Sequence, residues 1–361
     1  MGDSRIPPFR RRRPDPMIRR DAHLGEEPPV SIAHPYLLFL GDAPDQLAAK
    51  VADGVARWRR DWCVGQIRLP GCQADVGLPD ATLEEAAARG ARTLIIGVAN
   101  RGGRIAESWI PTMLRALELG LDIASGLHAK VADIAVVRDK AEAQGRRIFD
   151  VRHPARSFDV GNGVRRPGKR VLAVGTDCSI GKMFTALALE AEMRRRGMKA
   201  DFRATGQTGI LISGDGVSID AVVSDFVSGA VEWLCPANEP DHWDVVEGQA
   251  SVLHPSYGGV TLGLVHGSQP DAMVMCHEPA RPHMRGLPGR PVPDIRTCIA
   301  AHEQAARVTN PAARVVGISL NTSALDEAAA RDLIERTGRE HGLPCVDPVR
   351  TGVGPVVDVL G

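Results

Sequence analysis

An apolar stretch, a glycine-containing loop and an amphipathic stretch follow one another at residues 171–197, which read VLAVGTDCSIGKMFTALALEAEMRRRG. This order predicts a buried strand at 171–175, a loop after it and a helix at 181–197. Backbone N–H groups at the start of such a helix, together with the positive end of its dipole, attract an anion, and Lys182 adds a point charge. The sequence therefore predicts a phosphate-binding loop made of Gly175, Thr176, Asp177, Cys178, Ser179, Ile180, Gly181, Lys182 and Met183.

Residue 183 departs from the usual pattern of such loops. Loops that hold a metal-bound nucleoside triphosphate follow Gly-Lys with Ser or Thr, whose hydroxyl binds Mg²⁺. Met183 offers a thioether instead, which is a poor ligand for a hard cation. We therefore expect a phosphate-bearing ligand that binds without a metal ion. The alternative is that Thr185 or a neighbouring acidic residue holds the metal.

Strand patterns alternate with helical patterns along most of the chain, which predicts doubly wound α/β domains with parallel sheets. The stretches expected to contain strands are 36–42, 92–103, 121–128, 171–175, 199–206, 243–249, 271–278 and 314–322, and the expected helices are 83–90, 110–120, 181–197 and 325–342. A Gly-rich turn is expected after the strand at 199–206.

A segment rich in Gly, Pro and Arg, residues 152–170, separates the two groups of strands and is interpreted as a linker. We therefore expect one α/β domain at 36–151 and a P-loop-like domain at 171–361. Residues 1–35 contain a run of arginines and many prolines and cannot form a core, so we expect a flexible basic arm there. Ligands of doubly wound domains bind at the carboxyl ends of strands, which in the first domain points to Asp42, Asn100, Arg101 and His128.

Composition argues against several classes of partner. Lys+Arg and Asp+Glu both number 44, so the chain lacks the basic excess that usually accompanies nucleic-acid binding. No apolar run approaches the length of a membrane span. The seven cysteines are scattered, with no CxxC pair, which favours reduced thiols in the cytoplasm.

Acidic residues and histidines near the expected strand ends are candidates for proton transfer. Glu247 is a candidate general base, with a purely loop-positioning role as the alternative. Asp215, Asp220 and Asp225 lie in SGDGVSIDAVVSDF, interpreted as another strand-to-helix passage, and are alternative bases. His254 follows an apolar run and is a candidate to act as base or to bind an acyl oxygen.

A second group of residues offers hydrogen-bond donors for a substrate. Guanidinium groups bind carboxylates in bidentate fashion, and Arg203 and Arg350 are the candidates for that role. Thr205, Gln207 and Thr208 belong to TGQTG, whose N–H groups and side chains can bind a carboxylate or an oxyanion.

No metal cofactor is predicted. Cys276, His277 and Glu278 are adjacent, and adjacent residues of a strand point to opposite faces, so they form a poor chelate. Cys178 within the loop is a candidate acyl-accepting nucleophile, with packing against the sheet as the alternative.

Several longer stretches carry a resemblance to one family. They are GTDCSIGKM, ATGQTGILISGDGV (204–217), SDFVSGAVEWL (224–234), VEGQASVLHPSYGGVTLGLVHGSQPDAMVMCHEP (246–279) and CVDPVRTGVGP (345–355), with PYLLFLGD and WCVGQIRLPGC (62–72) earlier in the chain. Residues 35–361 resemble a family long classed as a domain of unknown function, with a Rossmann-like N-terminal domain before a P-loop domain. Its members include DgcN-type D-glutamate N-acetyltransferases.

This resemblance implies an N-acetyltransferase that uses acetyl-CoA as co-substrate and acts on a D-amino acid such as D-glutamate, in D-amino-acid catabolism. It also implies a small-molecule substrate and, we expect, a homodimer. Coenzyme A carries a pyrophosphate and a 3′-phosphate that need N–H donors and a lysine, but no catalytic Mg²⁺. A loop that keeps Gly181 and Lys182 but lacks the metal-binding hydroxyl suits this ligand.

Two alternatives remain open at this point. The spacing of the loop, with Gly175 six residues before Gly181, also resembles the GTDTxVGKT loop of dethiobiotin synthetase, which implies an ATP-dependent ligase or kinase. A non-catalytic nucleotide-binding protein is the other alternative.

Overall fold

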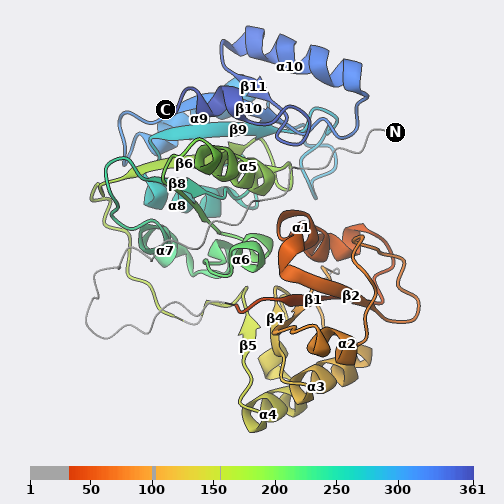
Figure 1. Cartoon of the computed structure of the whole chain (residues 1–361). Coiled ribbons are helices and arrows are strands. Elements are labelled where there is room, and N and C mark those ends of the chain that lie inside the picture. The colour runs from red at the N-terminus through yellow and green to blue at the C-terminus, as the bar shows by residue number, and fades with distance from the viewer. Residues whose placement is uncertain (1–31, 100–102, 155) are drawn as a thin grey trace. The chain divides into compact units, whose positions relative to one another are not determined.

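Short apolar runs form the strands of two parallel sheets in the computed structural model, which describes residues 32–99, 103–154 and 156–361 (Figure 1). The first sheet has the order β2-β1-β3-β4-β5, and all its neighbouring strands are parallel. Its strands are β1 (Tyr36–Gly41), β2 (Cys63–Arg68), β3 (Thr93–Ile96), β4 (Asp122–Ser125) and β5 (Ile148–Asp150).

The second sheet has the order β11-β10-β9-β6-β8-β7 and is also parallel. Its strands are β6 (Lys169–Gly175), β7 (Ala200–Arg203), β8 (Trp243–Val246), β9 (Ala272–His277), β10 (Arg314–Leu320) and β11 (Cys345–Val346). The first strand of this sheet in chain order, β6, lies between β8 and β9. The chain adds β7 and β8 on one side of β6 and then crosses to β9, β10 and β11 on the other. The loop after β6 therefore lies at the topological switch point, where doubly wound folds bind their ligands.

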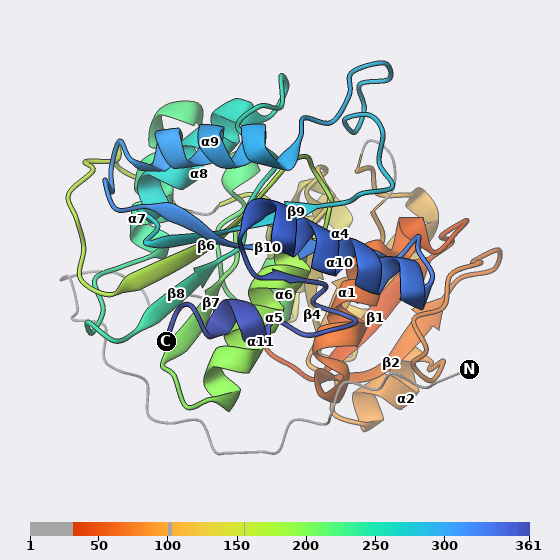
Figure 2. The ribbon, with the colours of Figure 1, turned by 90° about the horizontal axis from the view of Figure 1, so that it is seen from above.

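Helices cover both faces of each sheet, as Figure 1 shows for the first sheet and Figure 2 for the second. Those of the first half are α1 (Lys50–Trp58), α2 (Leu83–Ala88), α3 (Ile110–Glu118) and α4 (Ala135–Ala143); those of the second half are α5 (Lys182–Arg195), α6 (Gln207–Ser213), α7 (Val227–Leu234), α8 (Gly258–Ser268), α9 (Ile295–Ala306), α10 (Glu327–His341) and α11 (Gly354–Val357). Apolar residues of α7, α8 and α9 pack on one face of the second sheet, and those of α5 and α11 pack on the other. None of the helices in the described ranges combines the length and the apolar character that a bilayer span requires.

The expected α/β architecture is present, but two local expectations are wrong. TGQTG was expected to form only a turn, whereas α6 begins at Gln207. Ile210, Leu211 and Ile212 are all buried, and this burial stabilises a helix in a sequence whose glycines favour a turn. Residues 214–226 do not form a strand-to-helix passage, because this described segment connects α6 to α7 through two short 3₁₀ helices.

The chain already packs against the core before residue 36, where the first strand was expected to begin. The predicted arm covers residues 1–35, of which 1–31 lie outside the described residues. Ile32 is buried, and its N–H donates to the carbonyl of Gly214 at 3.2 Å. At the other boundary, β6 begins at Lys169, inside the stretch interpreted as a linker.

The two sheets are joined by one continuous apolar core along α1. Val51 and Val55 of α1 belong to the same buried cluster as Leu187 of α5 and Leu211 of α6. Figures 1 and 2 both show α1 beside α6. The Arg59 side chain adds a polar contact, since its Nε donates to the carbonyl of Ile212 at 3.0 Å. The two α/β halves therefore share buried apolar surface, and we expect them to unfold together.

Truncating the shared core tests this expectation. Leu211 is completely buried, so Leu211→Ala should lower the free energy of unfolding by about 3 kcal/mol, measured by urea denaturation, in a single transition. Leu47→Ala is the matched control, because that side chain is 67% exposed and its loss should change stability by less than about 0.5 kcal/mol. Two separate transitions, only one of which responds to Leu211→Ala, would contradict the shared core.

Candidate functional site

The loop from Gly175 to Met183 forms the centre of the candidate site. Gly181 precedes α5 with a φ of +110°, a conformation that glycine adopts without strain, and it turns the chain into the helix. The Thr176 N–H continues the sheet by donating to the Cys276 carbonyl at 3.1 Å, and the Thr176 hydroxyl lies 2.9 Å from Nδ1 of His277. The first N–H groups of α5 thus lie at the carboxyl edge of the second sheet, where they can bind an anion.

Lys182 is held over this loop. Its side chain is buried and passes Gly248, where an added Cβ would lie 3.1 Å from Cδ of the lysine. The ammonium group donates to the carbonyl of Asp177 at 2.6 Å. Burial lowers the pKa of Lys182. A cation is therefore buried against the loop, and the phosphate-binding role of Lys182 stays a prediction.

A segment that sequence analysis did not single out holds the loop in place. Asp177 is completely buried, and its Oδ2 accepts hydrogen bonds from Nη1 of Arg281 at 2.9 Å and from the backbone N–H of Arg285 at 2.8 Å. Arg281 also donates to the carbonyls of Cys178 and Ser179. Burial opposes ionisation of Asp177, but these hydrogen bonds outweigh it and lower its pKa. The loop conformation is thus fixed by the chain that follows β9.

His254 lies against the same loop, and a backbone hydrogen bond indicates the tautomer of its neutral ring. The backbone N–H of Ser256 donates to Nδ1 of His254 at 3.1 Å, so the neutral ring carries its proton on Nε2. Nε2 lies 3.6 Å from Oδ1 of Asp177, and both atoms are buried with no hydrogen-bond partner among the described residues. In this tautomer His254 is a hydrogen-bond donor rather than a base.

Among the described residues, Asp177, Cys178 and His254 form the one group whose ligand atoms are close enough to hold a metal ion, within 4.8 Å of one another. Coordination through Nε2 would require the proton on Nδ1, where the Ser256 N–H already donates. The hydrogen bonding therefore disfavours a metal at this position. Burial raises the pKa of the Cys178 thiol, which also disfavours a thiolate nucleophile.

Glu247 follows β8 and is buried beside the loop. Its Oε2 accepts hydrogen bonds from the N–H groups of Thr205 at 3.0 Å and Gly206 at 3.1 Å. Burial raises the pKa of Glu247 to about 7, although these two hydrogen bonds and the charge of Lys182 lower it. A carboxyl group with a pKa near neutrality can both accept and release a proton at pH 7, which suits a general base.

The TGQTG residues support Glu247 and contact the first domain. The Thr205 hydroxyl donates to the carbonyl of Glu247 at 2.7 Å. Gln207 lies against Gly126, just after β4, where an added Cβ would be 2.4 Å from its Oε1. Thr208 lies against Gly54 of α1, where an added Cβ would be 2.8 Å from its Cγ2. Two N–H groups expected to bind substrate therefore bind Glu247, and two side chains face the other domain.

Met183 has a structural partner that the sequence did not reveal. Its side chain packs on the core cluster shared by the two domains, and its Cε lies 3.8 Å from the Cβ position of Gly54. Residue 183, which carries a metal-binding hydroxyl in NTP-binding loops, thus makes a hydrophobic contact with α1 in this protein.

Three predicted site residues lie elsewhere. Arg203 donates through Nε to Asp244 at 2.7 Å, so its guanidinium group is already paired. Arg350 pairs with Glu327 at 2.7 Å. Asp215 lies after the carboxyl end of α6, whereas Glu247 contacts the chain at its amino end. Substrate or base roles for these three stay predictions, and the structure does not bring them to the loop.

The first domain contributes polar residues at its own strand ends. Asp42 accepts a hydrogen bond from Nε1 of Trp109 at 2.9 Å. His128 lies near Arg152, and burial followed by the charge of Arg152 lowers the pKa of His128. Arg152 pairs with Asp220 of the second domain. Asn100 and Arg101 lie outside the described residues.

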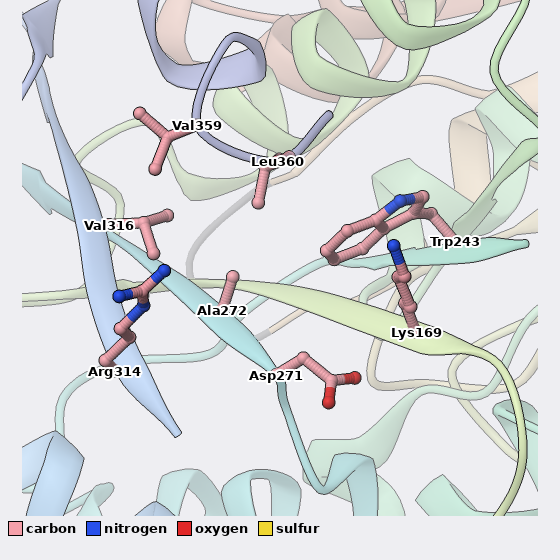
Figure 3. Close-up of a pocket in the computed structure, with 8 residues that line it drawn as sticks. All are labelled: Lys169, Trp243, Asp271, Ala272, Arg314, Val316, Val359 and Leu360. Atoms are coloured by element: carbon pink, nitrogen blue, oxygen red, sulfur yellow. The ribbon is translucent and has the colours of Figure 1, made fainter. Parts of the chain in front are cut away.

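A separate hollow of about 250 Å³ lies at the opposite edge of the second sheet. Figure 3 shows that it is lined by residues at the strand starts, including Lys169 of β6, Trp243 of β8 and Arg314 of β10. Because parallel α/β sheets bind ligands at the carboxyl ends of their strands, this hollow is distinct from the candidate site.

Residues 159–357 match the P-loop domain of DUF1611, and residues 67–154 match its Rossmann-like N-terminal domain; both are described as domains of unknown function. The first match alone covers more than half of the chain. The chain belongs to the DUF1611 family.

Solved and curated DUF1611 relatives agree with this assignment. A crystal structure of a DUF1611 family protein from Anabaena variabilis matches with a TM-score of 0.80 and 34% identity, over 91% of this chain and 99% of that protein. A protein of Tritonibacter scottomollicae is 56% identical over 329 residues, and one of a Pseudoalteromonas species is 48% identical over 328. Each match covers 91% of this chain and 99% of the relative, and both relatives are named D-glutamate N-acetyltransferase. The family and fold expected from the sequence are confirmed.

The raised pKa of Glu247 in this DUF1611 protein predicts a measurable effect on stability. Folding favours the protonated carboxyl, so its contribution is fully present below the ordinary pKa of 4.5 and is lost as the pH rises through about 7. Glu247→Gln stays neutral and should be more stable than the wild type by about 3 kcal/mol at pH 8. This gain should fall below about 1 kcal/mol at pH 5.

Urea denaturation at the two pH values measures the difference. Glu340→Gln is the matched control, because its side chain is 64% exposed and should give no such gain. An equal effect of Glu247→Gln at both pH values would contradict the raised pKa.

Proposed function

We propose that this chain is an N-acetyltransferase that moves the acetyl group of acetyl-CoA to the amine of a D-amino acid, D-glutamate or a close relative, in D-amino-acid catabolism. The observation that carries the proposal is the match, over 99% of their length, to two relatives named D-glutamate N-acetyltransferase. A cytoplasmic location and a homodimer stay predictions.

The loop geometry supports coenzyme A as the phosphate-bearing ligand. Lys182 and the N–H groups at the start of α5 offer positive charge and hydrogen-bond donors for a pyrophosphate. Met183 gives no oxygen ligand for Mg²⁺, which an acetyl transfer does not need because no bond to phosphorus breaks. This combination favours acetyl-CoA over a metal-bound triphosphate.

Glu247 supports the proton transfer that the reaction requires. The ammonium group of the amino acid must lose a proton before its nitrogen attacks the thioester carbon. Attack forms the C–N bond, and the nitrogen then loses a second proton. The C–S bond breaks, the released sulfur of coenzyme A takes up one proton, and one proton passes to solvent overall. A buried carboxylate with a pKa of about 7 can accept the proton from the ammonium group. We therefore propose Glu247 as general base, with burial as the main cause of its raised pKa and the charge of Asp220 as a smaller one.

His254 and the loop that it contacts are proposed to position these groups. With its proton on Nε2, His254 is a donor aimed at Asp177 and not a second base. Asp177 in turn holds Arg281, which binds two loop carbonyls. This network keeps the anion-binding N–H groups in one conformation before the ligand arrives.

An amino-acid panel in both D and L forms tests the function. Purified protein should release free thiol from acetyl-CoA with D-glutamate or a close relative, at the same rate after dialysis against EDTA. Acetyl-CoA should also raise the melting temperature without Mg²⁺. Release of ADP from ATP with a carboxylate, together with no protection by acetyl-CoA, would favour a ligase or kinase instead. Tight ligand binding without turnover would favour a non-catalytic protein.

The pH dependence of the rate tests the general base. With Glu247 as base, kcat/KM should rise with pH and level off above about pH 7, since only the ionised carboxylate accepts a proton. Glu247→Gln should lower kcat by roughly 100-fold or more and remove this ionisation from the profile. If Asp215→Asn removes the ionisation and Glu247→Gln keeps it, the base is Asp215.

A further inference from the structure

Lys50 lies on the face of α1 that meets the phosphate loop. Gly54 on this face contacts Thr208 and the Met183 side chain. Lys50 precedes Gly54 by four residues, so the two positions share one face of the helix. The lysine is therefore one turn beyond the contact with Met183, at the amino end of α1.

The directions of the helices show where this lysine points. Gly54 lies near Met183 at the start of α5, Trp58 stacks edge-on against Phe184 with ring centroids 5.7 Å apart, and Arg59 interacts with the charge of Glu190 further along α5. The helices α1 and α5 thus run in the same direction at this contact. Lys50 projects beyond the amino end of α5, on the side where the loop N–H groups are.

Arg285 reaches the same region from the segment after β9. Its backbone N–H donates to Asp177 inside the loop, and its side chain is exposed. Burial lowers the pKa of Lys50, and the charges of Arg285 and Arg152 lower it further, so the three cations are near one another. Arg152 is paired with Asp220.

Lys50 and Arg285 differ from the other cations around the loop. Among the described residues, neither has an acidic partner, whereas Arg281 pairs with Asp177 and Glu278. Two cations without an acidic partner beside this loop favour an anionic ligand.

We infer that Lys50 and Arg285 bind the phosphate groups of coenzyme A and supply the positive charge that a metal ion supplies in NTP-binding loops. The inference rests on the proposed function. Coenzyme A carries roughly four negative charges at neutral pH, two on the pyrophosphate and up to two on the 3′-phosphate. Lys182 neutralises only one of them. Met183 replaces the metal-binding hydroxyl of NTP-binding loops, and its side chain packs on α1. The same packing brings Lys50 of α1 to the loop.

Binding measurements on charge-neutral variants test this pair. Lys50→Gln and Arg285→Gln should each raise the Kd for acetyl-CoA about tenfold by calorimetry and weaken its salt dependence, with the KM for D-glutamate within about twofold of the wild type. Lys50→Arg should keep most of the affinity, which separates a charge effect from misfolding. Lys169→Gln is the matched control, because that lysine lies at the opposite sheet edge (Figure 3). The same Kd measurements with 3′-dephospho-CoA identify the phosphate group that the pair binds. If the variants bind this ligand as tightly as the wild type does, the pair binds the 3′-phosphate; if they bind it more weakly, the pair binds the pyrophosphate.

The outcomes separate this inference from the proposed function. If the KM for D-glutamate rises while the Kd for acetyl-CoA stays constant, the pair binds substrate carboxylates and the phosphate assignment is overturned. If both variants bind acetyl-CoA like the wild type and acetylate D-glutamate normally, the inference fails and the proposed function stands. If the wild type does not bind acetyl-CoA at all, both fail.

Discussion

The packing of α1 of the first domain against the amino ends of α5 and α6 is the contact on which the site depends. Gly54 allows the helices to approach until Met183 and Thr208 touch it. The same surface buries Leu211 and Leu187 in a core common to both sheets. Because the loop after β6 and α1 are joined by this core, the first domain forms part of the candidate site and is more than an appended unit.

Two buried groups of opposite charge lie at the centre of the candidate site. Lys182 and Glu247 are both buried, and the attraction between them only partly offsets the unfavourable burial of the carboxylate. Two backbone N–H groups hold Glu247 in place, so a group with a near-neutral pKa is kept rigid. Fixed orientation and a matched pKa are the two properties that proton transfer requires.

The sequence predicted the strands and the strand–loop–helix arrangement around Gly181 because both depend on local patterns. The runs before Gly41 and Gly175 are apolar because each strand is covered on both faces. Three features of the structure could not be predicted from local sequence patterns. α6 forms because tertiary packing overrides its glycines, Arg281 reaches the loop from the chain after β9, and Arg203 pairs with Asp244 across neighbouring strands. Each depends on contacts between residues distant in sequence, which local patterns do not encode.

The thioether at residue 183 also bears on selectivity among the nucleotides of a cell. ATP there circulates mainly as its magnesium complex, and Met183 provides no coordination for that complex at residue 183. Replacing the methionine alone would not restore it, because α1 covers the site from the other domain. Under the proposed function, this architecture would discourage competition from the abundant triphosphate pool through residue 183 and α1 alone.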